Sequence, residues 1–166
     1  MTGDEVGTAR SEIEAAYQRC AEAIAARDVN AFFAAFNPRS SRVRADSQVE
    51  PFLGSGTQAY FVWRFGRLVA SHEFTLVIDA FQLAGDRATI EFTEDNEATV
   101  LDADDRPVRR RAHVRERGVW VRTPEGWMQV EGQFLESPEI TVDGTPVAPK
   151  ADPVGAAAYE ASRVRP

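Results

Sequence analysis

Two adjacent segments of opposite charge decide the fold, namely DRATIEFTEDNEATVLDADD at residues 86–105 and RPVRRRAHVRERGVWVR at residues 106–122. The first holds eight acidic residues against one arginine, a net charge of −7, and the second holds seven arginines against one glutamate, a net charge of +6. Apolar and polar residues alternate in both segments, which is typical of β-strands. The turn residues at 102–106 therefore predict an antiparallel hairpin whose two strands attract each other.

The five-residue turn also predicts the register of this hairpin, because it sets Leu101 opposite Pro107. On one face, the directly opposed pairs are then Glu97 with Arg111, Asp95 with His113 and Glu91 with Arg117. On the other face, Ala88, Ile90, Phe92 and Glu94 lie across from Trp120, Gly118, Glu116 and Val114. We expect the first face to be solvated and the second, which is mostly apolar, to point toward the core.

The composition is that of a single globular domain. The 166 residues are 43% hydrophobic and 27% charged, and no apolar run reaches the ~18 residues of a membrane span. The net charge of −7 disfavours nucleic acid and anionic membranes as partners. The single cysteine, Cys20, permits no intramolecular disulfide, and the acidic residues that follow Met1 do not resemble a signal peptide. We therefore expect a cytoplasmic protein that binds neither nucleic acid nor membrane.

Helices are expected before the strands. Ser11 forms a capping box with the glutamate three residues later, so the first helix is predicted to begin there. Asp28 can cap a second, short helix, and Thr57 can cap a third helix that runs to about Ala70. The pattern then changes to four sequential antiparallel strands at residues 74–83, 88–101, 108–123 and 127–135.

The chain is divided by these patterns into a flexible N-terminus at residues 1–9, one domain at residues 10–140 and a Pro/Ala-rich tail at residues 141–166. The residues from Ser137 onward are rich in proline, and we expect them to be irregular apart from one or two helical turns at 156–163.

Three acidic residues remain on the face that is expected to point inward. Glu94 and Glu116 are diagonal neighbours in the predicted register, and Glu131 joins them if alternation continues along the last strand. A carboxyl group that is buried beside another one has a raised pKa, which suits it to exchange a proton near neutral pH. The alternative is that the sheet twists and that these acids emerge at a solvated rim.

The order of three helices followed by antiparallel strands, with GVWVRTPEGW at residues 118–127, resembles the nuclear transport factor 2-like superfamily, and in particular its SnoaL-like and ketosteroid isomerase-like branch. AARD at residues 25–28, followed by Phe32, Phe33 and Phe36, and the segment at residues 56–65 resemble the helical part of that family. The resemblance implies an α+β cone, or cystatin-like roll, in which the N-terminal helices pack in the concave face of a strongly curved antiparallel sheet around a ligand pocket. Members of the superfamily include isomerases, cyclases, dehydratases, epoxide hydrolases and proteins without catalysis.

The resemblance also implies roles for particular residues. The isomerase branch has a catalytic base on the short strand after the second helix, where Asp46 stands. It has an oxyanion-binding tyrosine on the first helix near Cys20, with Tyr17 one turn earlier, and an oxyanion-binding acid at Gly118, with Glu116 one inward position away. The epoxide hydrolase branch uses an Asp-Arg-Asp arrangement, and we expect no inward arginine of that kind here.

These observations predict a cofactor-independent isomerase, cyclase or dehydratase that acts on an apolar or polycyclic molecule. The predicted catalytic residues are Asp46, Glu116, Glu131 and Tyr17, and the predicted pocket-lining residues are Cys20, Tyr60, Trp63, Phe92, Glu94 and Trp120. No metal or other cofactor is expected, since His72 and His113 lie far apart and one cysteine offers no ligand spacing.

The alternative is a non-catalytic module that binds a ligand or pairs with a partner through the outer face of the sheet. The resemblance implies a homodimer through that face, where Val119, Val121, Val130 and Phe134 could be exposed.

Overall fold

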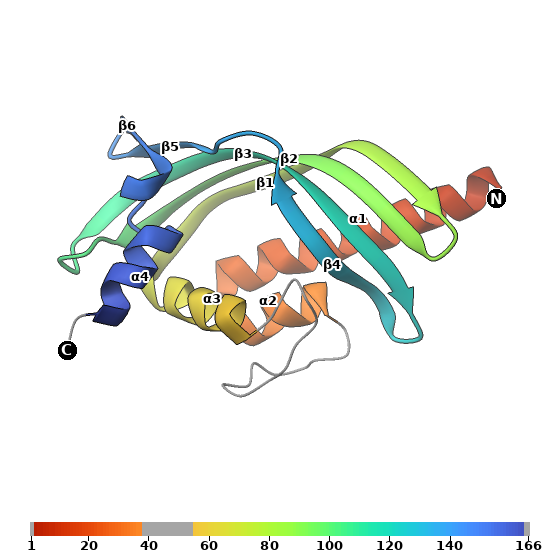
Figure 1. The fold of residues 1–166 in the computed structure, drawn as a ribbon, viewed down its shortest axis with the longest axis horizontal. Helices are drawn as coiled ribbons and strands as arrows, with labels where there is room; N and C mark the ends of the chain where they lie inside the picture. Colours follow the sequence, from red (N-terminus) through yellow and green to blue (C-terminus); the bar gives the residue numbers. More distant parts are fainter. Residues whose placement is uncertain (1, 38–54, 165–166) are drawn as a thin grey trace.

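The computed structural model describes residues 2–37 and 55–164 and shows an α+β fold in which helices cover one face of an antiparallel sheet (Figure 1). The helices are α1 (Gly3–Ala26), α2 (Val29–Phe36), α3 (Ser55–Arg67) and α4 (Ala156–Val164). The strands are β1 (Leu68–Ala84), β2 (Arg87–Leu101), β3 (Pro107–Thr123), β4 (Gly126–Phe134), β5 (Glu139–Val142) and β6 (Thr145–Val147). The predicted catalytic base Asp46 lies outside the described residues.

Helix α1 begins at Gly3, well before the predicted start at Ser11. The hydroxyl oxygen of Thr2 accepts from the backbone N–H of Glu5, and the Glu5 carboxylate accepts from the backbone N–H of Thr2 at 2.7 Å. This capping box satisfies two backbone donors that would otherwise lack partners, so it starts the helix at the earlier of the two capping sequences. Residues 3–9, which were predicted to be flexible, are therefore helical.

The short second helix begins where the sequence predicts. The carboxylate of Asp28 accepts from the backbone N–H of Ala31 at 3.0 Å, as an N-cap should. The third helix ends at Arg67 rather than at Ala70, and β1 starts at the next residue, Leu68, because it pairs with β2 from its first residue onward.

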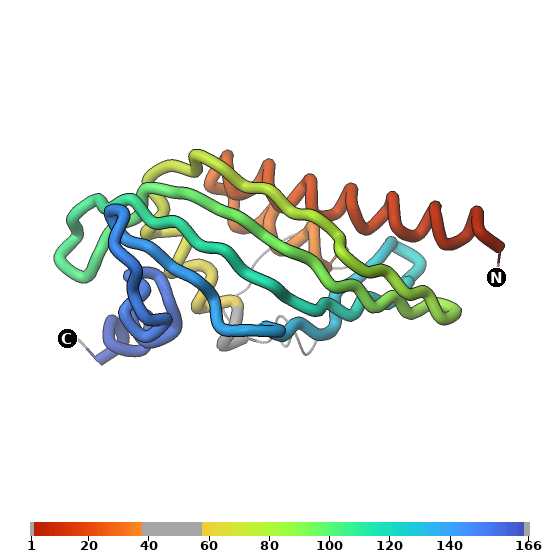
Figure 2. Tube along the Cα trace, turned by 90° about the horizontal axis from the view of Figure 1, so that it is seen from above, coloured from red at the N-terminus to blue at the C-terminus, as the bar shows by residue number. Residues whose placement is uncertain are grey.

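The hairpin of β2 and β3 has the predicted register at every position that we named, on both faces. Three ion pairs cross the charged face, namely Arg117 with Glu91, His113 with Asp95 and Arg109 with Glu97. The third pair differs from the prediction, because Glu97 lies opposite Arg111 but binds the diagonal neighbour Arg109. Figure 2 shows the long strands of this hairpin side by side, with β1 along the outer edge of β2.

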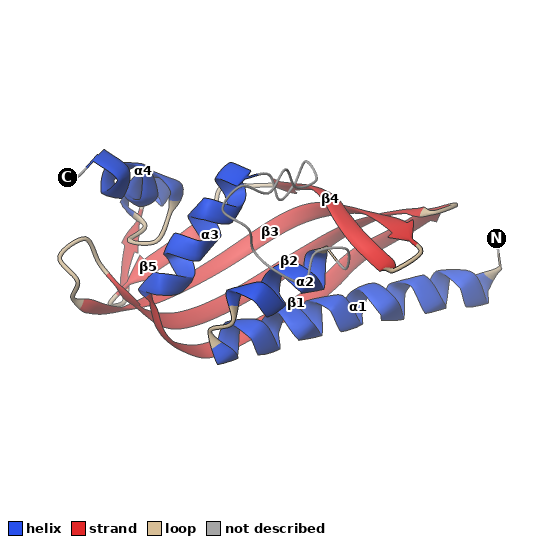
Figure 3. Ribbon diagram, turned by 90° about the horizontal axis from the view of Figure 1, so that it is seen from below, coloured by secondary structure: helices blue, strands red, loops and turns tan. Residues whose placement is uncertain are grey.

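The C-terminal residues form more regular structure than predicted. The helical turns predicted at 156–163 are confirmed by α4, but strands β5 and β6 stand where irregular chain was expected. Strand β5 pairs with the first half of β3, whereas β4 pairs with the second half, and the sheet has six strands instead of four. Helix α4 then packs beside α3 (Figure 3).

A buried ion pair holds this C-terminal segment on the sheet. Arg110 of β3 donates from Nε and Nη2 to the two carboxylate oxygens of Asp152, at 2.7 Å each. Both side chains are 6% exposed, and Asp152 Oδ1 also accepts from the backbone N–H of Val154. The pairing joins residues 42 positions apart, which explains why no local pattern in the tail predicted it.

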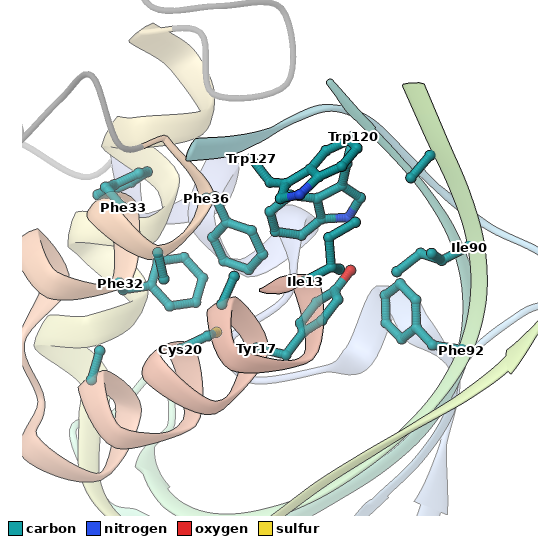
Figure 4. Close-up of a cluster of buried hydrophobic side chains, with 14 of the residues drawn as sticks. Ile13, Tyr17, Cys20, Phe32, Phe33, Phe36, Ile90, Phe92, Trp120 and Trp127 are labelled. Carbon is teal, nitrogen blue, oxygen red and sulfur yellow. The ribbon is translucent and has the colours of Figure 1, made fainter. Parts of the chain in front are cut away.

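The core lies between the helices and the inner face of the sheet. Its largest fully buried side chains include Trp120, Phe33, Ile13 and Ile90, and Figure 4 shows Trp120 packed against the rings from α1 and α2.

The outer face of the sheet exposes fewer apolar side chains than predicted. Val119 is buried, and Val121 and Val130 are half-buried. Phe134 is exposed, but it lies opposite Glu116 in the pairing of β3 with β4 and therefore on the inner face of the sheet.

We predict that Asp152→Asn lowers the free energy of unfolding by about 3–5 kcal/mol, because it leaves the buried Arg110 guanidinium without its counter-charge. Urea unfolding monitored by circular dichroism would measure the loss. The matched control is Asp104→Asn, which removes an exposed ion pair with Arg106 and should cost less than about 1 kcal/mol.

The pH dependence of stability gives a second measure of the same ion pair. Burial alone would raise the pKa of Asp152, but Arg110 outweighs burial and holds that pKa below its ordinary value. The stabilisation should therefore be present at neutral pH and be lost as the pH falls through the lowered pKa. Equal acid sensitivity of the unaltered protein and Asp152→Asn would contradict this assignment.

Candidate functional site

A cavity of about 1210 Å³ lies between the helices and the inner face of the sheet. Aromatic side chains from the helices and β2 form much of its wall, and they include Phe32, Phe36, Tyr60, Phe61, Phe65 and Phe92. The C-terminal segment that the Arg110–Asp152 pair holds in place contributes further wall residues, among them Val154 and Ala157. A mostly apolar enclosure with a few polar groups is typical of sites for small molecules.

Two carboxyl groups point into this cavity from neighbouring strands. Glu94 of β2 and Glu116 of β3 both line it, on the face that the register predicted. Burial raises the pKa of Glu116 to about 7, and the negative charge of Glu94 adds to the effect. Burial also raises the pKa of Glu94, against the opposing influence of the Asn96 hydrogen bond and of Arg64. At neutral pH this pair can therefore both hold and release a proton.

A chain of hydrogen bonds orients Glu94. Asn96 Nδ2 donates to Glu94 Oε1 at 2.7 Å, and Arg110 Nη1 donates to Asn96 Oδ1 at 3.0 Å. Because a guanidinium can only donate, Arg110 fixes the amide of Asn96 with its NH₂ group toward Glu94. Glu94 Oε1 is therefore a hydrogen-bond acceptor, and a proton on Glu94 must reside on Oε2. Since Arg110 is itself held by Asp152, the C-terminal segment controls the orientation of a cavity acid.

Arg64 of α3 brings a positive charge to the cavity wall. Its Nη1 donates to the hydroxyl oxygen of Tyr60 at 3.1 Å, and that hydroxyl donates to the carbonyl oxygen of Val154 at 2.9 Å. Burial disfavours the charged guanidinium, but the Tyr60 oxygen, Asp152 and Glu94 outweigh it and raise the pKa of Arg64. The guanidinium therefore remains charged at every pH at which the protein is folded.

Three polar side chains meet above Gly118 on β3. A Cβ atom at this position would lie 3.3 Å from Gln129 Nε2, 3.3 Å from Trp120 Nε1 and 3.4 Å from Tyr17 Oη. Within the described ranges, Tyr17 Oη, Trp120 Nε1 and Gln129 Oε1 are buried without a hydrogen-bond partner. Burial also raises the pKa of Tyr17 well above its ordinary value, so its hydroxyl keeps its proton. The absence of a side chain at Gly118 leaves these groups facing one another.

Glu131, a predicted catalytic residue, lies at the solvated edge of the cavity and not in its interior. In the pairing of β3 with β4, Trp120 lies opposite Gln129 but Val119 lies opposite Glu131, so β4 has one extra residue at this point. This β-bulge reverses the alternation and turns Glu131 outward. Its side chain is 64% exposed and its carboxylate pairs with Arg87 at 2.8 Å.

Most of the other predicted residues do lie at the cavity. Tyr17, Cys20, Tyr60, Phe92, Glu94 and Glu116 all line it. Trp63 instead packs against Tyr60 and Tyr159, and Trp120 is fully buried in the core between Tyr17 and Phe36 (Figure 4).

Two inward arginines, Arg110 and Arg64, were not among the site residues predicted from the sequence. Every second residue of β3 faces inward, so the inner face continues from Glu116 to Arg110. The predicted register could therefore have indicated that Arg110 points inward. Arg64 follows Tyr60 by one helical turn, and the aromatic face of this helix could have indicated it.

The described part of the chain contains no group of three or more His, Cys, Asp or Glu side chains that could hold a metal ion. Among its helices, none is both long and apolar enough to cross a membrane.

Solved structures with similar folds include proteins of the nuclear transport factor 2-like superfamily. The "putative dehydratase from the NTF2-like family" of Streptomyces avermitilis has a TM-score of 0.52 and 19% identity, and the match covers 74% of this chain and 91% of that protein. An NTF2-like superfamily protein from Salmonella enterica has a TM-score of 0.53 and 20% identity, with coverage of 77% and 90%. The Kfla4162 protein from Kribbella flavida has a TM-score of 0.55 and 20% identity, also with coverage of 77% and 90%.

The chain therefore has the NTF2-like fold, as predicted from the sequence. No protein-family model and no curated protein matches the sequence.

We predict that Glu116 titrates with a pKa of about 7 and that Glu94→Gln lowers this pKa, because it removes a neighbouring negative charge. Carbon-detected nuclear magnetic resonance of the glutamate side chains would follow the titration. The control is Glu131→Gln, which changes an exposed carboxylate and should leave the Glu116 pKa in place. Titration of Glu116 near 4.5, its ordinary value, would show that the cavity does not desolvate it.

Protein stability should report the same raised pKa. The folded state favours protonated Glu116, so the unaltered protein should lose stability as the pH rises from about 4.5 to about 7. Glu116→Gln lacks this titration. The variant should therefore gain on the order of 2–3 kcal/mol relative to the unaltered protein between pH 5 and pH 8, as measured by urea unfolding.

Proposed function

We propose that this protein is a cofactor-independent acid/base enzyme that binds a small apolar or polycyclic molecule in its cavity. The observation that carries the proposal is the pair of carboxyl groups, Glu94 and Glu116, inside an aromatic-walled cavity. Isomerisation, cyclisation and dehydration all need a proton to be removed at one atom and supplied at another, and two coupled carboxyl groups can do both.

The two acids would have different tasks. The pKa of Glu116 is about 7, so its ionised form is present at neutral pH. Ionised Glu116 would take a proton from one atom of the ligand and return it to another atom. Glu94 has Oε1 occupied by the Asn96 amide, so its other oxygen would hold or receive the second proton. General acid/base catalysis by such positioned groups contributes roughly 10²- to 10⁴-fold in rate.

The cluster above Gly118 would assist by binding a ligand oxygen. The Tyr17 hydroxyl is a buried donor at the cavity wall, and Glu116 lies two residues before Gly118 on the same face of β3. An oxygen that gains negative charge when a proton leaves the adjacent carbon would be stabilised by such a donor. This arrangement, together with the NTF2-like fold, supports a place in the SnoaL-like and ketosteroid isomerase-like branch.

The NTF2-like neighbour from Streptomyces that carries a dehydratase name is consistent with this reaction class. The other function that fits the same cavity is ligand binding without turnover. The two differ in whether the acids exchange protons with the ligand.

Deuterium exchange tests the proposal without knowledge of the natural substrate. We expect the protein to catalyse exchange of the α-protons of fused-ring ketones, such as 2-tetralone and 1-indanone, with deuterated buffer. Proton magnetic resonance would follow the exchange above the buffer rate. Because the ionised form of Glu116 is the base, the catalysed rate should rise with pH through about 7 and then level off.

Glu116→Gln should lower the catalysed exchange rate by at least about 100-fold. Glu91→Gln is the matched control, because it removes a carboxylate from the charged outer face of β2 and should leave the rate unchanged. Binding of these ketones without exchange would favour the non-catalytic module, and exchange that persists in Glu116→Gln would refute the assigned base.

A further inference from the structure

We propose that the cavity takes a small molecule that carries a carboxylate, and that the guanidinium of Arg64 binds this carboxylate. The inference rests on the proposed function, because it names the class of molecule that the same cavity would hold. Its evidence, however, comes from the contacts of Arg64 and not from the two acids.

Among the described residues, Arg64 is a charged cavity residue without a carboxylate partner. A guanidinium offers five N–H donors, and the described residues supply one acceptor for them, the hydroxyl oxygen of Tyr60 at 3.1 Å. None of the ion pairs in the described residues includes Arg64, whereas exposed arginines such as Arg106 and Arg117 each have a carboxylate partner. Partial burial of an ionised group is unfavourable unless hydrogen bonds and an opposite charge compensate for it.

The other inward arginine shows the difference. Arg110 donates to both carboxylate oxygens of Asp152 and to the amide oxygen of Asn96, so its donors are taken up by the protein itself. Arg64 lines the same cavity, but the part of the chain that the structure describes offers it no such carboxylate. A ligand carboxylate would give Arg64 the two-point contact that Asp152 gives Arg110.

The two cavity acids are poor substitutes for that carboxylate. Neither Glu94 nor Glu116 lies within ion-pair distance of Arg64 in the described structure, although its charge acts on both. Burial raises the pKa of both acids and so disfavours their charged forms. The positive charge of Arg64 is therefore only partly balanced when the cavity holds no anion.

The orientation of Arg64 is fixed before any ligand arrives. Tyr60 accepts from Arg64 and donates to the carbonyl oxygen of Val154, so it links the guanidinium to the C-terminal segment. The Tyr60 ring also packs against Trp63 and Tyr159, which restricts its movement. A guanidinium that is held in place loses little freedom on binding, which favours affinity.

The surroundings of Arg64 indicate the rest of the molecule. Phe61 and Phe65 flank Arg64 in the sequence of α3, and both line the cavity. The ligand would therefore combine one carboxylate with an apolar, ring-containing body. The whole chain has a net charge of −7 and repels free anions, so any preference for a carboxylate must arise from a local positive group.

Two probes of nearly equal shape test this inference. The 2-naphthoate anion and neutral 2-naphthamide share the ring system and a planar head group, but they differ in charge. Isothermal titration calorimetry at pH 7 should show that the unaltered protein binds 2-naphthoate about 10- to 100-fold more tightly than 2-naphthamide.

Variants of Arg64 should change this ratio in a defined way. In Arg64→Gln the two probes should bind with affinities that agree within about threefold, while the affinity for 2-naphthamide stays near that of the unaltered protein. Arg64→Lys should keep part of the preference, because a lysine supplies charge without the two-point geometry. Arg87→Gln removes one exposed arginine far from α3 in the sequence and should keep the full ratio, which controls for the overall charge.

The outcomes separate this inference from the proposed function. Equal affinity of both probes for the unaltered protein overturns carboxylate binding but leaves proton transfer by Glu116 intact, since the exchange assay uses neutral ketones. An unchanged ratio in Arg64→Gln overturns the role of Arg64. Failure of both probes to bind overturns this inference and the small-molecule cavity together. If Arg64→Gln does not fold, the ratio in the unaltered protein and its reduction in Arg64→Lys still decide the question.

Discussion

The pairing of β2 with β3 is the constraint on which the site depends. The two strands carry opposite charge along most of their length, and ion pairs such as Arg117 with Glu91 cross one face only. A shift by one residue would exchange the two faces, so that charged side chains would enter the core. The register that buries Trp120 and Ile90 is the same one that aims Glu94 and Glu116 into the cavity. Charge complementarity on the solvated face thus places the polar groups on the other face.

A second long-range contact completes the cavity. The buried pair of Arg110 and Asp152 fixes the C-terminal segment against β3, and that segment then supplies wall residues and the carbonyl group of Val154 that anchors Tyr60. The same Arg110 also orients Asn96 and, through it, Glu94. One buried ion pair therefore couples the position of the C-terminal helix to the geometry of an acid on β2, although their residues are far apart in the sequence.

The features that local chemistry determines could be predicted from the sequence. The hairpin register follows from a short turn and the pattern of charge, and the cap at Asp28 follows from a single side chain. Features that depend on contacts between distant residues could not be predicted. The outward position of Glu131 results from a β-bulge that the alternation of side chains does not reveal. The path of the C-terminal segment results from the ion pair between Asp152 and Arg110. The inward position of Arg110 could have been predicted, because the inner face of β3 extends to it.

The polar groups of the cavity weaken the fold that contains them. Raised pKa values for Glu94 and Glu116 mean that folding makes ionisation of both acids less favourable, and Tyr17 and Trp120 are buried with polar atoms that lack partners in the described structure. Apolar side chains of similar size would fill the same space without these costs. The core around Phe33 and Ile13 shows that this chain can pack apolar side chains closely where nothing else is required. Glu94, Glu116 and Tyr17 oppose folding and line one cavity, and a bound molecule explains such a cluster better than stability does.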